Sequence, residues 1–308
     1  MNHDHFIAPP GKKIRLKDYD PGFTSHFKNK AAAAAKLRKD IEQLAKYQGM
    51  LYAQKSHALL VVLQAMDTAG KDGTIRHVMS GVNPQGTQVH PFKAPSTEER
   101  NHDYLWRSMK AMPERGQIGI FNRSYYEEVL VVRVHPELLD SQRLPPDARG
   151  TDIWNLRFYE INEFEKYLVR NGIVILKFFL HLSKAEQKRR LLARIDTPEK
   201  NWKVSLFDAK ERGFWDDYMN AYQDILNHTS TAHAPWYIIP ADHKWFTRTV
   251  VADVIIEKLK SLKLSYPVAG AAHLRQILEA KELLLAEPPD ANQEDHEPPD
   301  MKTVRETR

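Results

Sequence analysis

One eleven-residue run, Gln64–Thr74 (QAMDTAGKDGT), contains the residue types that bind phosphate. It follows the apolar run Leu59–Leu63, which predicts a buried strand that ends in a loop. In a phosphate-binding loop, successive backbone N–H groups and a helix N-terminus converge on the anion, while a lysine reaches its terminal phosphates. We therefore expect Lys71 to bind phosphate.

The run departs from the usual pattern of such loops at two positions. Ala65 takes the place of the first glycine, and Asp72 replaces the hydroxyl residue that normally helps to hold Mg²⁺. Because Mg²⁺ prefers hard oxygen ligands, we expect Asp67 and Asp72 to bind Mg²⁺, or Mn²⁺, directly or through water. The alternative interpretation is an ordinary strand-to-helix turn capped by an aspartate.

A second polar segment, Asn122-Arg123-Ser124, follows the strand-like run 118–121. Ligands bind at the carboxyl ends of the strands in an open parallel sheet, so we expect this segment and Asp67 to face one cleft. Arg123 can pair bidentately with a phosphate, and Glu127 adds a carboxylate one turn later. The alternative is a helix cap with a surface arginine.

A third concentration of charge lies at residues 184–212, where nine bases stand against five acids. The bases are Lys184, Lys188, Arg189, Arg190, Arg194, Lys200, Lys203, Lys210 and Arg212. This pattern indicates a lid, at about residues 184–215, that closes arginines over transferring phosphates and excludes water. The alternative is a solvated basic helix face.

The composition limits the class of protein. The 308 residues are 42% hydrophobic and 28% charged, as in ordinary globular proteins. The lack of cysteine excludes disulfides and thiolate chemistry and favours a reducing compartment, and no leader or membrane-spanning pattern is visible. We expect a cytoplasmic protein with no membrane partner. The spacing of His77, His90, His102 and His135 does not indicate a zinc site.

The charge is unevenly distributed along the chain. The formal net charge is +5, but residues 287–308 carry seven acids and three bases, and removing this tail's −4 leaves +9. A basic body implies an anionic partner: nucleic acid, a membrane surface or a polyanionic substrate. The tail has the composition of a disordered segment.

Strand-like and helix-like segments alternate along the chain. We expect helices at about 30–48, from 70, from 95 through Trp106, and at 151–170, 183–195 and 244–260, with strands at 59–65, 87–92, 118–121, 173–180 and 236–239. This order predicts an α/β fold with a parallel sheet covered on both faces. The expected organisation is an irregular segment 1–29, a catalytic domain 30–265, and a helix and acidic tail at 266–308.

Five motifs in order make the chain resemble the family-2 polyphosphate kinases over about residues 12–265. They are Met66–Thr74, Asn83–Gly86, Asp103–Arg107, Phe121–Glu127 and Ala234–Tyr237. The resemblance implies a three-layer α/β/α P-loop kinase core, similar to thymidylate kinase, with a helical lid. It also implies that inorganic polyphosphate donates its terminal phosphoryl group to a nucleotide, reversibly and with Mg²⁺.

The resemblance also implies roles for particular residues. The expected catalytic residues are Asp67, Lys71, Asp72, Arg123, Arg190 and Arg194, and the expected substrate contacts are Ala69, Gly70, Gly73, Thr74, Arg76, Asn122, Tyr126, Glu127, Arg133 and Lys203. Asn122 and Glu127 match the subgroup thought to phosphorylate both AMP and ADP. By analogy, we expect a homodimer or homotetramer.

Two other functions share some of these features. An ATP-dependent nucleoside monophosphate kinase would have the same loop, lid and sheet. A nucleic-acid-binding protein would explain the basic body but not the carboxylates around Lys71, so we expect no nucleic-acid partner.

Overall fold

The computed structural model describes residues 1–25, 27, 29–150 and 152–287, apart from the side chains of residues 147, 149 and 203. The chain divides into two units, Met1–Tyr266 and Pro267–Arg308. The second unit contains α12 (Ala271–Ala286), which has no buried residue. The part of the acidic tail beyond residue 287, expected to be disordered, lies outside the described residues.

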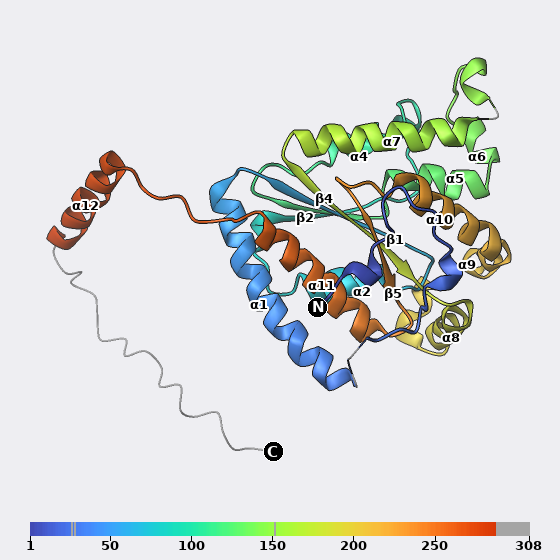
Figure 1. The fold of residues 1–308 in the computed structure, drawn as a ribbon, viewed down its shortest axis with the longest axis horizontal. Coiled ribbons are helices and arrows are strands. Elements are labelled where there is room, and N and C mark those ends of the chain that lie inside the picture. Colours follow the sequence, from blue (N-terminus) through green and yellow to red (C-terminus); the bar gives the residue numbers. More distant parts are fainter. Residues whose placement is uncertain (26, 28, 151, 288–308) are drawn as a thin grey trace. The chain divides into compact units, whose positions relative to one another are not determined.

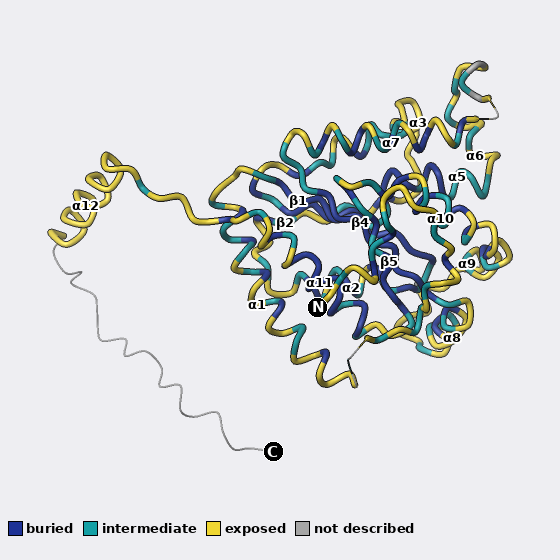
Figure 2. Tube along the Cα trace, in the orientation of Figure 1, coloured by how far each residue is buried: buried dark blue, intermediate teal, exposed yellow. Residues whose placement is uncertain are grey.

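A five-stranded parallel sheet forms the centre of the first unit, in the order β2-β3-β1-β4-β5. Its strands are β2 (Thr87–Pro91), β3 (Ile118–Asn122), β1 (Ala58–Ala65), β4 (Ile173–His181) and β5 (Trp236–Pro240). Every residue of β1 is buried, as expected for a central parallel strand with helices on both faces (Figure 2). The predicted α/β fold with a parallel sheet is confirmed.

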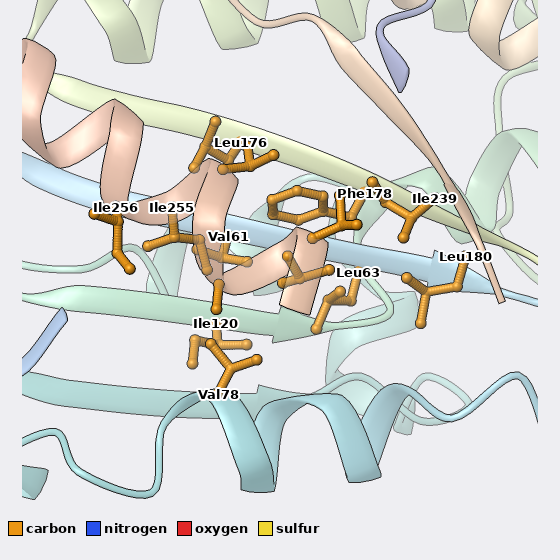
Figure 3. Packing of buried hydrophobic residues seen from close by; sticks show 14 of the residues in the cluster. Val61, Leu63, Val78, Ile120, Leu176, Phe178, Leu180, Ile239, Ile255 and Ile256 are labelled. Atoms are coloured by element: carbon orange, nitrogen blue, oxygen red, sulfur yellow. The ribbon is translucent and has the colours of Figure 1, made fainter. Parts of the chain in front are cut away.

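Helices cover both faces of the sheet (Figure 1). On one face, α1 (Lys30–Gln54), α2 (Lys71–Val78) and α11 (Lys244–Ser261) enclose a core that includes Val61 and Phe178. Figure 3 shows side chains of this core, from the strands and from α11, pointing toward one another. On the other face, α7 (Ile153–Arg170) and α10 (Trp215–Thr229) pack on the sheet.

Most of the expected elements form close to their predicted bounds, and two regions differ. The single helix expected from 95 through Trp106 is wrong, because α3 (Thr97–Arg100) and α4 (Trp106–Lys110) form instead. Ser96 and Glu99 cap α3 reciprocally, and Asp103 Oδ1 accepts the Leu105 N–H in a turn before α4. Helix α10 is the second difference, because no helix is expected there from the sequence.

The remaining elements are short, apart from α8, which follows β4. The α-helices are α5 (Val131–Val134), α6 (Glu137–Asp140), α8 (Lys184–Ile195) and α9 (Leu206–Glu211). The 3₁₀ helices are η1 (Asp4–Phe6), η2 (Leu16–Asp18), η3 (Pro84–Gly86), η4 (Tyr125–Val129), η5 (Pro146–Arg149), η6 (Pro198–Lys203) and η7 (Arg212–Phe214). Among the described residues, no helix combines the length and apolar character needed to cross a bilayer.

A buried ion pair joins the sheet to the helices on the α7 face. Lys177 Nζ in β4 lies 2.6 Å from Glu165 Oε2 in α7, and neither side chain has exposed surface. Lys177 Nζ also donates to Tyr126 Oη (2.9 Å) and Thr229 O (2.7 Å). The hydroxyls of Tyr125 and Tyr126 both donate to Glu165 Oε1 at 2.8 Å. The pair therefore links β4, α7, α10 and η4.

Replacing Lys177 with methionine would leave the Glu165 carboxylate buried without its counter-charge. We expect Lys177→Met to lower the free energy of unfolding by about 3–5 kcal/mol, measured by urea denaturation followed by circular dichroism. The double variant Lys177→Met/Glu165→Gln removes both charges and keeps an oxygen for the tyrosine hydroxyls, so it should recover most of the loss. A wild-type unfolding midpoint for Lys177→Met would contradict this role.

Candidate functional site

The loop between β1 and α2 has a strained backbone. Thr68 (φ 64°) and Gly70 (φ 108°) both lie in the left-handed region. A β-branched residue such as threonine rarely adopts this conformation, and such strain is concentrated at ligand-binding loops. The turn places the N-terminus of α2, which begins at Lys71, at the carboxyl edge of the sheet. This is the local geometry of a phosphate-binding loop.

Helix α8 and Lys71 hold the carbonyl groups of the loop. Arg190 Nη1 donates to Thr68 O and Ala69 O, both at 3.0 Å, and Gln187 Nε2 donates to Asp67 O at 3.2 Å. Lys71 Nζ donates to Ala65 O at 2.9 Å. Because N–H and C=O point in opposite directions in a trans peptide, the bonds from α8 turn the next amides away from that helix.

The Arg190 guanidinium also connects the loop to the end of β5. Its Nη2 donates to Ala241 O (2.7 Å) and Asp242 O (3.0 Å), and its Nε donates to Glu186 Oε1 (2.7 Å). The side chain is buried. In this structure, the arginine expected to act in catalysis binds the backbone of the phosphate loop, and α8 supports that loop.

Arg123 brings the ends of β1 and β3 together. Its N–H donates to Leu63 O at 3.0 Å, which continues the strand pairing by one residue. Its backbone then turns into the left-handed region (φ 66°). Nη2 donates to Asp67 Oδ1 (2.9 Å) and Nη1 to Glu127 Oε2 (3.2 Å). These carboxylates, Glu127 more than Asp67, raise the pKa of Arg123. The two segments expected to face one cleft are thus in direct contact.

Lys71 lies buried beside this cluster. Burial and the positive charge of Arg123 lower the pKa of Lys71, while nearby carboxylates, with Asp67 the strongest, oppose the shift. On the next residue, Asp72 Oδ1 accepts a hydrogen bond from Asn122 Nδ2 at 2.8 Å. A bound phosphate would supply negative charge to two cations that now repel each other.

The two aspartates provide a donor set that fits Mg²⁺. No three His, Asp or Glu side chains come together as a ready-made metal site in the part of the chain that the structure describes. Asp67 and Asp72 each use one oxygen in the hydrogen bonds above and keep a second. Mg²⁺ commonly binds one or two carboxylates and completes its shell with phosphate oxygens and water.

Three of the residues predicted to contact substrate have contacts inside the protein. Tyr126 is fully buried, with its hydroxyl bound to Glu165, so its ring has no surface for a ligand in this structure. Arg133 Nη2 donates to Asp224 Oδ2 in α10 at 2.5 Å. The Thr74 side chain is buried, and its N–H donates to Gly70 O.

Two predicted lid residues lie at the end of α8 and beyond it. Arg194, in the last turn of α8, has its Nη1 3.7 Å from Asp208 Oδ2 in α9. Burial, followed by the charge of Asp67, raises the pKa of Asp208, which indicates that α9 lies near the loop. Lys203 ends η6, and its side chain lies outside the described part of the chain.

Sequence reasoning missed four residues around the loop: Gln187, Asp208, Lys244 and Arg248. A Cβ placed on Gly70 would lie 4.0 Å from Lys244 Cγ, and one on Gly73 would lie 3.4 Å from Arg248 Nη2. Lys244 is the first residue of α11, the helix that follows the last strand, and Arg248 is the fifth. Their spacing of four residues in the sequence predicts that they share one face of that helix.

The chain is similar to known phosphotransferases. The family model described as Polyphosphate kinase 2 matches residues 27–266. A Rhodopseudomonas palustris protein named ADP-polyphosphate phosphotransferase is 50% identical over 281 residues, which cover 91% of this chain and 97% of that protein. A Meiothermus ruber protein named AMP/ADP-polyphosphate phosphotransferase is 44% identical over 275 residues, or 89% and 99%. The crystal structure of polyphosphate kinase 2 from Arthrobacter aurescens TC1 has a TM-score of 0.79, with 39% identity and coverage of 89% and 98%.

The support that α8 gives to the loop can be tested without substrate. Hydrogen bonds from Arg189, then from Arg190, lower the pKa of Glu186 from 4.5 to about 2. A carboxyl group whose pKa is lower in the folded state than in the unfolded state stabilises the protein at pH values above its unfolded-state pKa. This stabilisation is lost as the pH falls through the folded-state pKa. We expect the urea midpoint of wild type to exceed that of Glu186→Gln above pH 4.5, with the difference shrinking toward pH about 2.

The matched control is Glu42→Gln, which removes an exposed carboxylate from α1. Its midpoint should stay close to wild type at each pH. A difference between wild type and Glu186→Gln that does not change with pH would contradict the proposed ion pairing.

Proposed function

This chain belongs to the polyphosphate kinase 2 family, and on that premise we propose that it transfers the terminal phosphoryl group of inorganic polyphosphate to ADP and to AMP. The products are ATP and ADP, respectively. The observation that carries the proposal is the contact of Arg123 with Asp67 beside buried Lys71, at the end of a phosphate loop. The names of the two relatives, one for ADP and one for AMP and ADP, support both acceptors.

The proposed reaction is an in-line displacement. An oxygen of the acceptor's terminal phosphate attacks the terminal phosphorus of the chain, and the bond from that phosphorus to the bridging oxygen breaks. The shortened chain leaves with the bonding electrons as an anion. Because the attacking oxygen is already ionised near neutral pH, the protein mainly has to position both phosphates and neutralise charge.

Lys71 and Arg123 are the cations that we assign to this work. When phosphate binds, Lys71 exchanges Ala65 O for a phosphate oxygen. Arg123 has a planar guanidinium already oriented by Asp67 and Glu127, so little side-chain ordering remains when it binds phosphate.

We assign a divalent cation, Mg²⁺ or Mn²⁺, to Asp67 and Asp72. When bound, the ion would neutralise charge on the phosphate oxygens. Asp67 would then contact both the metal and Arg123. Asn122 keeps Asp72 oriented toward the end of β3.

Purified protein should form ATP from ADP, and ADP and then ATP from AMP, with long-chain polyphosphate and Mg²⁺ as the only donor and metal. Chelation of the metal with EDTA should stop both reactions, because the phosphate charges would no longer be neutralised. Chromatographic separation of the nucleotides measures each product. Product from AMP with ATP but not with polyphosphate as donor would favour the ATP-dependent monophosphate kinase instead.

Removal of the Lys71 ammonium should abolish transfer and leave the fold intact. We expect Lys71→Ala to reduce kcat with polyphosphate by at least about 10²-fold, the size of effect seen when a transition-state charge partner is lost. Lys39→Ala, which removes an exposed lysine from α1, is the matched control and should keep wild-type turnover. Wild-type turnover of a folded Lys71→Ala protein would sink the assignment.

A further inference from the structure

Helix α12 has an apolar face that its own unit leaves uncovered. No residue of this helix is buried, and Figure 2 shows it exposed along its whole length. Five large apolar side chains recur at helical spacing on one side of it, each 46% to 75% exposed, and we call them the α12 stripe. They are Leu274, Ile277, Leu278, Leu284 and Leu285. The helix lies beyond residues 27–266, which match the family model, so the phosphotransferase core does not account for the stripe.

The length of α12 indicates that it needs a partner surface. The helix has 16 residues and is therefore about 24 Å long at 1.5 Å per residue. An isolated helix of about this length is marginal in water even when its residues favour helix, as alanine, leucine, glutamate and lysine do. Most helices in proteins gain their stability by packing an apolar face. The α12 stripe is therefore the surface that a partner would cover.

The charges of α12 favour another helix as that partner. Arg275 and Lys281 balance Glu279 and Glu282, so the four charges sum to zero. A helix that lies on an anionic membrane surface has an excess of lysine and arginine on its polar face, which this helix lacks. Lys281 lies in the middle of the α12 stripe, and one polar residue inside an apolar seam is typical of paired helices, where it fixes register and orientation.

The α12 stripe is complementary to itself when two copies run antiparallel. In the register centred on the middle of the helix, Leu274 lies opposite Leu285 of the second copy. Leu278 then lies opposite Lys281, whose alkyl stem can cover the leucine while its ammonium group stays in water. Both contacts occur twice, because such a pair has two-fold symmetry. The apolar seam is thus continuous across the pair.

The residues that flank the seam match in the same register. Ile277 lies opposite Leu284 of the second copy on one flank, and Arg275 lies opposite Glu282 on the other. A parallel pair would instead place Lys281 against Lys281 and separate Arg275 from Glu282 by seven residues, about 10 Å. Charge complementarity therefore selects the antiparallel orientation.

We propose that α12 is a self-association surface, which pairs antiparallel with α12 of a second copy of this chain. The occupant of the α12 stripe is then the same stripe of the other copy. Two helices of about four turns make a small contact, so the association is reversible. This pairing does not depend on the proposed function, because α12 contains none of the residues assigned to phosphate, metal or nucleotide.

Cross-linking tests the orientation directly, because the chain has no cysteine of its own. Leu274→Cys and Leu285→Cys are introduced into separate full-length proteins, which are mixed at low concentration and treated with a short bismaleimide. We expect mass spectrometry to find mainly a link between positions 274 and 285 of different chains. Links between two copies of position 274 should be rare, because these positions lie about 16 Å apart along an antiparallel pair.

The matched control mixes Gln276→Cys with Leu283→Cys. These positions lie at matching levels of the proposed pair but on its outside, away from the α12 stripe. They should cross-link only at the low rate of random collision.

Reversal of charge tests the assigned ion pairs. Arg275→Glu or Glu282→Arg, made in both cross-linking proteins, places like charges opposite each other twice in each pair. Either change should lower the rate of the link between positions 274 and 285 about tenfold, and the two changes together should restore it. Glu279→Arg makes the same substitution outside the seam and should leave the rate unchanged.

The remaining outcomes count against the pairing. A link between positions 274 and 285 no faster than that of the control positions would overturn it. Links of position 274 to itself and of position 285 to itself would show a parallel pair and overturn the assigned orientation. A doubly reversed protein as slow as either single variant would overturn the ion pairs. Loss of phosphoryl transfer in wild type bears on the proposed function alone.

Discussion

The site depends most on the hydrogen bonds of the Arg190 guanidinium. They join four backbone carbonyl groups that follow the ends of two strands, β1 and β5. A loop that presents amides to an anion must turn carbonyls toward the protein, and buried carbonyls need donors. Two of the four belong to the strained turn at Thr68 and Ala69. Without that cation, the strained turn would have to compete with relaxed conformations in which its carbonyls reach water. The geometry of the loop is therefore a property of α8 as much as of the loop's own sequence.

Below the loop, the buried Lys177–Glu165 pair has a comparable role for the β3 side. Its tyrosine partners begin η4, the turn that carries Glu127 and follows Arg123. Trp236 packs edge-on against Tyr126 at 4.7 Å, and its indole donates to Thr229, so the Ala234–Tyr237 motif belongs to the same buried cluster. This buried cluster thus anchors the start of η4, two residues after Arg123.

The sequence predicted β1, β3, β4 and β5 well because each is a short, mostly apolar run, and a central parallel strand has no polar face to interrupt the pattern. It failed where polar or aromatic residues obscure the periodicity. Helix α10 has buried Trp215, Tyr218, Tyr222 and Ile225 at helical spacing, but it begins where the basic segment ends, and the charge of that segment predicts a lid. The split of α3 from α4 depends on a capping box and an aspartate turn, which are local competitors of a continuous helix.

In the candidate site, too, some features can be predicted from the sequence and others cannot. The meeting of Asp67 with Arg123 follows from two strand ends at one edge of a parallel sheet, which the sequence can predict. The positions of Lys244 and Arg248 depend on which strand lies next to which, and no local pattern encodes that order. For Arg190, the residue type indicates a role near phosphate, but the sequence does not show which way the side chain points. A cation near phosphate can face the ligand or the carbonyl groups that shape the binding loop. In a loop whose backbone is strained, the second use removes a cation from the phosphate surface, and the shape of the loop then depends on α8.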